Sequence, residues 1–246
     1  MSDIENPRMY LHPATFIDSD HPAILASVES VVEPGSDNIS KAVALYYHVR
    51  DGLRYNPYSL AISPQGYLAS TTLAAGEGWC VTKALVLAAL CRAAGIPARV
   101  GYADVRNHLS TERLRESMQT DIFYFHGYTS IYLNDRWVKA TPAFNIELCE
   151  KFGLQPLEFN GLEDSLYHEF DLAGNRHMEY LNDRGEYPDL PFDELMRVMG
   201  KYYPKLMEPS AATDAANLSA ADWEADVELE VSQPTAQASG HAGTQG

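Results

Sequence analysis

An apolar stretch between residues 80 and 94 constrains the fold of this chain more than any other feature. It reads CVTKALVLAALCRAA and is followed by Gly95 and Pro97, which is how a helix usually ends. A helix that is apolar around its whole circumference must be buried on nearly every side. A second helix is predicted over Lys41–Arg50, and the Pro- and Ser-rich stretch from Tyr55 to Gly76 is expected to form an irregular loop.

Alternation of apolar and polar residues predicts three strands after this helix. They cover Arg99–Val105, Tyr124–Leu133 and Arg136–Thr141. Asn134 and Asp135 separate the last two and suit a tight hairpin turn. Consecutive antiparallel strands next to a buried helix predict an α+β domain, in which the helix packs on an antiparallel sheet.

The composition excludes several classes of protein. The chain has 246 residues, of which 46% are hydrophobic and 21% charged, as in globular proteins. Its net charge of −16 provides no basic field for nucleic acid. No stretch has the roughly 18 apolar residues of a membrane helix, and charged residues interrupt the first thirty positions, so we expect a cytoplasmic protein without membrane contact. Cys80, Cys91 and Cys149 are expected to be free thiols.

Cys80 has the position of a reactive cysteine. It lies in the first turn of the predicted helix, where the helix N-terminus and a nearby imidazolium favour a thiolate. Gly78 and Trp79 precede it, and their backbone amides could face a developing oxyanion or a substrate. Cys91, in the middle of the same helix, is interpreted as a small buried core residue.

His126 is the histidine whose context fits a partner for Cys80. The chain has eight histidines. Of these, His126 begins a strand of the sheet on which the helix of Cys80 is expected to pack, and Gly127 leaves room beside its ring. A histidine taken singly is more often a core or surface residue, so the assignment depends on this context.

A series of motifs occurs in a fixed order between Ser40 and Asn145. The motifs are YHVRDGLRY at 47–55, GWC at 78–80, KA at 83–84, LAAL at 87–90, AAGIPARV at 93–100, HGY at 126–128, IYL at 131–133, WV at 137–138 and TP at 141–142. Together they closely resemble the transglutaminase-like superfamily, of the bacterial cysteine protease type. The resemblance implies a papain-like cysteine fold in which Cys80 attacks an amide carbonyl, His126 is the base and an acid orients the histidine.

The orienting acid of the family is missing. The family usually reads W-V-x-x-D-P, and Thr141 stands where the Asp is expected. A neutral orienting group is compatible with Cys-His catalysis, as in Cys-His-Asn sites. Thr141 is favoured in this role and Asn145 is the alternative, whereas Asp135 lies at the far end of the hairpin. A strand residue without a chemical role is the other interpretation of Thr141.

The resemblance and the composition together predict the domain organisation. Residues 1–208 are expected to form one transglutaminase-like domain, with a core over 40–145 and an extension over 146–208. Residues 209–246 contain six acidic residues and no Lys or Arg, which predicts a disordered acidic tail. Within it, Leu218 to Val231 is the one part expected to support a short helix or a docking strand.

The predicted function is cysteine-dependent amide hydrolysis or acyl transfer through a thioester, on a peptide or protein amide. The alternative is an inactive, peptide-binding descendant that has lost the acid. Gln65 is a further candidate donor to the oxyanion, with a surface turn as the alternative. No cofactor and no metal are predicted, since no histidine pair has ligand spacing, and the oligomeric state is left open. Residues 79–141 have more basic than acidic side chains, a sign that favours a thiolate.

Overall fold

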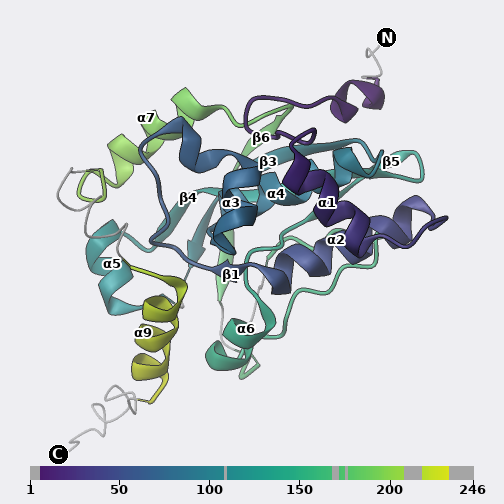
Figure 1. The fold of residues 1–246 in the computed structure, drawn as a ribbon. Coiled ribbons are helices and arrows are strands. Elements are labelled where there is room, and N and C mark those ends of the chain that lie inside the picture. The colour runs from purple at the N-terminus through teal and green to yellow at the C-terminus, as the bar shows by residue number, and fades with distance from the viewer. Residues whose placement is uncertain (1–5, 108–109, 168–171, 175–176, 208–217, 233–246) are drawn as a thin grey trace, which may run out of the picture.

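A computed structural model describes residues 6–107, 110–167, 172–174, 177–207 and 218–232 (Figure 1). Its central element is helix α4, Cys80–Ala93, which has almost only buried residues. One side of α4 packs on the sheet, and the opposite side is covered by three helices (Figure 1). These are α1 (Pro22–Val31), α2 (Asn38–Gly52) and α3 (Ala69–Ala75). The burial on all sides that the apolar sequence predicts is therefore confirmed.

A four-stranded antiparallel sheet forms the other layer. Its strand order is β5-β4-β3-β6, so β3 and β4 lie in the middle. The strands are β3 (Ala98–Asn107), β4 (Ile122–Leu133), β5 (Arg136–Ala140) and β6 (Met178–Tyr187). Asn134 and Asp135 both have positive φ in the β4–β5 turn, as a tight hairpin requires. The predicted α+β fold, with a buried helix on an antiparallel sheet, is confirmed.

The structure differs from the sequence expectation in several elements. The stretch expected as a loop contains the short helix η2 (Pro64–Tyr67) and then α3, which ends at Gly76 with φ 71°. The short strands β1 (Arg54–Tyr55) and β2 (Glu77–Gly78) precede η2 and follow α3 in the chain, and they pair in parallel. Strand β6 was not predicted, because its edge position exposes many of its side chains and hides the alternation.

The remaining helices flank this core: η1 (Pro7–Leu11), α5 (Glu112–Met118), α6 (Ile146–Phe152), α7 (Phe192–Tyr202) and α9 (Ala220–Ser232). For Leu218 to Val231 the sequence predicted either a short helix or a docking strand, and the structure has the helix, α9. This part of the acidic segment is therefore folded. Trp223 is 2% exposed and packs near Tyr55, Tyr58 and Phe152. The neighbouring stretches 208–217 and 233–246 lie outside the described residues, so the domain boundary at residue 208 stays a prediction.

Candidate active site

Strand β2 pairs in parallel with β1 and leads directly into the first turn of α4. Gly78 fits here because a Cβ would lie 2.5 Å from Thr82 Oγ1 and 2.8 Å from Thr72 Cγ2. Trp79 is the N-cap residue of α4, and its side chain makes no capping hydrogen bond among the described residues. Cys80 is therefore the first helical residue, next to the positive end of the helix dipole.

A close backbone contact joins this turn to β4. A Cβ on Gly127 would lie 2.9 Å from Val81 Cα and 3.1 Å from the carbonyl oxygen of Cys80, so only glycine permits this approach. His126 immediately precedes Gly127 and is 5% exposed. The structure thus brings the segments of the predicted nucleophile and base against each other.

Burial raises the pKa of the Cys80 thiol to about 11, although the backbone amides of Gly127, Val81 and Cys80 itself act in the opposite direction. Burial also raises the pKa of Cys91 and of Cys149, each to about 12. Backbone N–H groups at the start of α4 and on β4 thus stabilise the thiolate of Cys80 against the effect of burial.

Thr141 follows β5 and lies at the same small cavity as His126. Both residues line this cavity together with apolar side chains. The Thr141 backbone is fixed, because its amide donates to Ser165 (2.8 Å) and its carbonyl accepts from the Tyr46 hydroxyl (3.2 Å). Its Oγ1 is buried and has no hydrogen-bond partner among the described residues. The position is compatible with the predicted orienting role, which stays a prediction.

Asn145 and Gln65 are the other two polar side chains with predicted roles at the site. Asn145 Oδ1 accepts from the Tyr55 amide (3.1 Å), and Nδ2 donates to Glu147 (2.8 Å), so both ends of the buried amide are engaged. Gln65 is exposed on η2 and does not appear among the described residues that line the pocket of Cys80. Their assignments as orienting group and oxyanion donor remain untested predictions.

A family model described as the transglutaminase-like superfamily matches residues 26–142. Residues 26–142 belong to the transglutaminase-like superfamily. This segment runs from α1 to the end of β5 and includes Cys80, His126 and Thr141. The family resemblance of the motifs is therefore confirmed, and no curated protein matches the chain.

Two solved structures are similar to parts of this chain. One, from Cytophaga hutchinsonii, is described as a "putative cysteine protease": it has 19% identity and a TM-score of 0.43, and the match covers 75% of this chain and 55% of that one. The other, from Parabacteroides distasonis, is described as a "putative protease", with 16% identity, a TM-score of 0.34 and coverage of 51% and 25%. The chain thus matches about half and a quarter of the lengths of these proteins.

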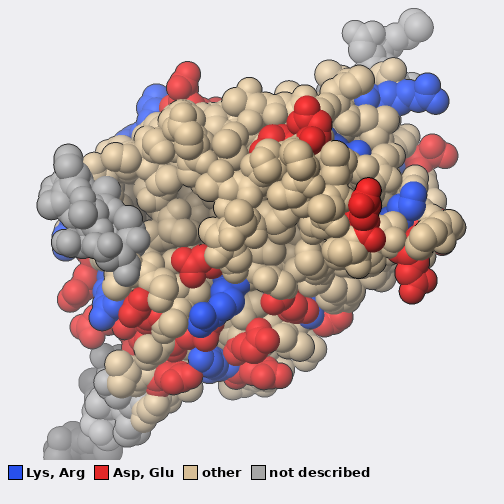
Figure 2. Space-filling view, viewed as in Figure 1, with Lys and Arg blue, Asp and Glu red and all other residues tan. Residues whose placement is uncertain are grey.

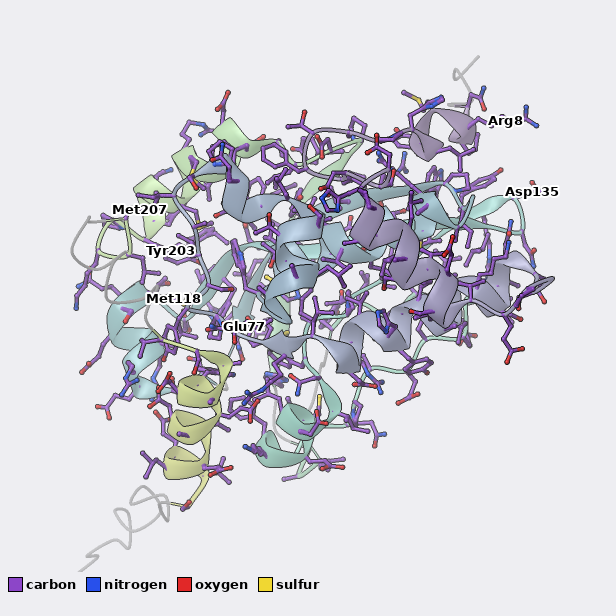
Figure 3. The ribbon with its side chains drawn as sticks, in the orientation of Figure 1. Arg8, Glu77, Met118, Asp135, Tyr203 and Met207 are labelled. Atoms are coloured by element: carbon purple, nitrogen blue, oxygen red, sulfur yellow. The ribbon has the colours of Figure 1, made fainter. Side chains whose placement is uncertain are left out.

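An apolar pocket opens beside Cys80 of the transglutaminase-like domain. Figure 2 shows a hollow on the left of the view, within a part of the surface that carries no Lys, Arg, Asp or Glu. Helix α5 and the end of α7 supply residues that the sequence patterns did not indicate, and Figure 3 shows Met118 and Tyr203 on this side. The lining residues are Tyr55, Pro57, Leu60, Trp79, Cys80, Leu114, Met118, Phe123, Tyr124, Tyr203 and Leu206.

Among the residues that the structure describes, no group of three or more His, Cys, Asp or Glu side chains is placed to hold a metal ion. Within the same residues, no helix is long and apolar enough to cross a bilayer.

Proposed function

We propose that this protein is a cysteine-dependent amide hydrolase or acyl-transferase, with Cys80 as nucleophile and His126 as general base and acid. The observation that supports the proposal is the close contact between the first turn of α4, which contains Cys80, and the backbone at Gly127, the residue after His126. A cysteine at a helix N-terminus with a histidine on the adjacent strand is the arrangement that thioester chemistry needs.

The reaction follows from these groups. His126 takes the proton of the Cys80 thiol, the sulfur forms a bond to the amide carbon, and the carbonyl π electrons move to the oxygen. When the tetrahedral intermediate collapses, the C–N bond breaks, and the nitrogen leaves with the proton that His126 returns. Water, or a second amine in the transferase case, then attacks the thioester carbon, gives its proton to His126 and releases the Cys80 thiol.

Backbone and indole N–H groups near Cys80 suit the oxyanion. The amides at the start of α4 already stabilise negative charge on the Cys80 sulfur. Trp79 lines the pocket, and its Nε1–H is buried with no acceptor among the described residues. A buried donor without an acceptor costs free energy, and a substrate carbonyl in the pocket would provide the acceptor. We assign Trp79 and the backbone around Gly78 to substrate binding on this basis.

A second candidate function is peptide binding without catalysis. The high pKa of the Cys80 thiol and the neutral Thr141 in place of the family acid favour it. The two functions differ in whether an imidazole activates the sulfur.

Iodoacetamide alkylation, located by peptide mass spectrometry between pH 5 and 10, separates them. In the proposed enzyme Cys80 reacts well below the ordinary cysteine pKa of about 8.5, and His126→Gln abolishes that low-pH reactivity while leaving the thiolate reaction at high pH. Cys80→Ala removes the label. Labelling centred on Cys91 or Cys149, or a Cys80 profile that is the same in His126→Gln, contradicts the enzyme assignment.

A further inference from the structure

The pocket beside Cys80 has a wall without formal charge. None of its lining residues is Lys, Arg, Asp or Glu, and five of them are aromatic. Cys80 and Trp79 belong to this wall, so any acyl group that is bonded to the Cys80 sulfur lies next to it.

Two hydrogen bonds engage the hydroxyl of Tyr203, one of the polar atoms of this wall. The Tyr203 hydroxyl accepts from the Tyr124 amide (2.6 Å) and donates to the Ile122 carbonyl (2.8 Å). The Tyr203 hydroxyl is therefore hydrogen-bonded to the backbone at the start of β4. A preformed apolar site of this kind selects ligands by the apolar surface that they bury.

We infer that the acyl part of the substrate carries an uncharged apolar side chain next to the carbonyl that Cys80 attacks. This inference rests on the proposed function. A charged side chain would lose its hydration in the pocket without a partner of opposite charge. A leucine or phenylalanine side chain gains about tenfold or more in affinity by burial.

The test uses peptidyl acyloxymethyl ketones that differ only in the side chain next to the ketone: Leu, Phe, Gly, Glu or Lys. The rate constant of Cys80 labelling is expected to be at least tenfold higher for Leu or Phe than for Gly, and lowest for Glu and Lys. Equal rates, or a preference for a charged probe, would overturn the inference while the labelled Cys80 upholds the proposed function. Failure of every probe at Cys80 overturns both.

A matched pair of variants locates the selectivity. Met118→Lys puts a cation in the pocket and is expected to shift the preference toward the Glu probe. Leu162→Lys makes a similar change at a residue that is 46% exposed and outside the pocket lining, and it should leave the preference unchanged. If Met118→Lys folds with the wild-type preference, the pocket does not bind the acyl side chain.

A second inference comes from a β-bulge next to His126. Ala103 is paired with His126 and Val105 with Phe123, so Asp104 on β3 faces both Tyr124 and Phe125 on β4. Phe125 has a φ of 65°, a conformation that bulky side chains rarely adopt and that neighbours must enforce.

The bulge separates the two sides of the site. Phe123 and Tyr124, before it, line the apolar pocket of Cys80. His126, after it, lines the cavity that contains Thr141. One extra residue in a strand changes the face on which the following side chains lie, so this bulge decides where the imidazole is directed.

Asp104 and Arg184 enclose the strained residue from two sides. Asp104 is 5% exposed, and its Oδ1 accepts from the Phe125 amide (3.2 Å). The same oxygen pairs with Arg184 Nε at 2.5 Å. The Arg184 guanidinium lies over the Phe125 ring, 5.1 Å from its centroid. Asp104, Phe125 and Arg184 thus each contact the other two.

We propose that Asp104 is a positioning residue for His126, acting through the left-handed backbone of Phe125 that it and Arg184 maintain. The proposal rests on the assignment of His126 as base. Asp104→Ala should lower the rate of Cys80 alkylation at pH 7 at least tenfold and remove the part of the pH profile that depends on His126. Asp104→Asn, which keeps an acceptor for the Phe125 amide, should retain part of the rate.

A matched control and a rescue variant make the test specific. Arg99 and Glu186 form a comparable ion pair between β3 and β6, also at 2.5 Å, away from the bulge. Glu186→Gln should therefore reduce stability without altering the pH profile. Phe125→Gly allows positive φ without strain and should restore alkylation in the Asp104→Ala background.

The outcomes separate this proposal from the proposed function. A wild-type pH profile in folded Asp104→Ala, an equal change in Glu186→Gln, or no recovery in the double variant would overturn the positioning role. If Asp104→Ala does not fold alone, the double variant and Asp104→Asn decide by the same profile. If His126→Gln leaves the wild-type profile unchanged, the assignment of His126 itself is wrong.

Discussion

Gly127→Ala is the substitution that most directly tests the contact between α4 and β4. The new Cβ would lie 2.9 Å from Val81 Cα and 3.1 Å from the Cys80 carbonyl oxygen, and both neighbours are backbone atoms that cannot rotate away. To reach 3.4 Å, where ordinary van der Waals contacts begin, β4 and α4 must separate by about half an ångström. Overpacking of this kind costs about 1–3 kcal/mol.

The consequence for reactivity follows from the same displacement. A misplacement of about 1 Å can cost 100-fold in rate, so half of it is expected to lower Cys80 alkylation at pH 7 by about tenfold. It also weakens the effect of the Gly127 amide, which lowers the pKa of the Cys80 thiol. We therefore expect the alkylation profile of the variant to move to higher pH.

Urea unfolding and the iodoacetamide pH profile measure the two effects. With a loss of about 2 kcal/mol and a slope of about 2 kcal/mol per M, the unfolding midpoint falls by about 1 M. Gly200→Ala is the matched control, because a Cβ there meets nothing within 4 Å in helix α7; it should stabilise the fold by about 0.5–1 kcal/mol. A Gly127→Ala protein with the wild-type midpoint and profile would refute the close-contact reasoning.

Three further predictions use residues outside this contact. Asn145→Ala leaves the buried Tyr55 amide without its acceptor and should cost about 1–3 kcal/mol of unfolding free energy; an altered Cys80 alkylation profile would instead support its role as orienting group. Burial lowers the pKa of Lys83 to about 7 from 10.5. Between these pH values the unfolded chain binds a proton that the folded protein has released, so the free energy of unfolding rises with pH. Lys83→Met should remove this rise, and urea unfolding at several pH values that gives the wild-type slope for the variant would contradict the prediction. Trp223→Ala should cost about 3–5 kcal/mol and expose α9 to limited proteolysis, whereas equal protease resistance would show that α9 does not depend on this ring.

Local patterns predicted the central part of this fold well. The apolar run at residues 80–94, with its Gly and Pro stop, corresponds to α4, whose bounds the structure places at Cys80–Ala93. The hairpin at Asn134 and Asp135 depends on positive φ at both residues, a property of the turn itself. The neighbourhood of Cys80 and the His126 strand could be inferred because the helix had to pack on the sheet, and Gly127 indicated room beside it.

Long-range features of the site had no comparable signal in the sequence. The pocket is formed by Leu114 and Met118 of α5 together with Tyr203, far apart along the chain, and only packing brings them together. The bulge at Phe125 is invisible in the alternation of β4, since a phenylalanine there fits an ordinary strand. It becomes apparent only from the pairing with β3 around Asp104.

The distribution of charge shows why a linear count does not predict a local field. Residues 79–141 have an excess of basic side chains, which suggested a field that favours a thiolate. In the structure Arg113 pairs with Asp226 (3.3 Å) and Arg115 with Glu230 (3.4 Å), both on helix α9.

Other cations of the segment are also engaged away from Cys80. Arg99 pairs with Glu186, and Lys83 donates to the Arg50 and Leu53 carbonyls from a fully buried position. The pKa of the Cys80 thiol responds instead to burial and to three backbone amides. The acidic helix that a charge count assigns to a separate tail therefore neutralises Arg113 and Arg115 of this segment. In the proposed mechanism, activation of the sulfur is left to the amides and to the imidazole on β4.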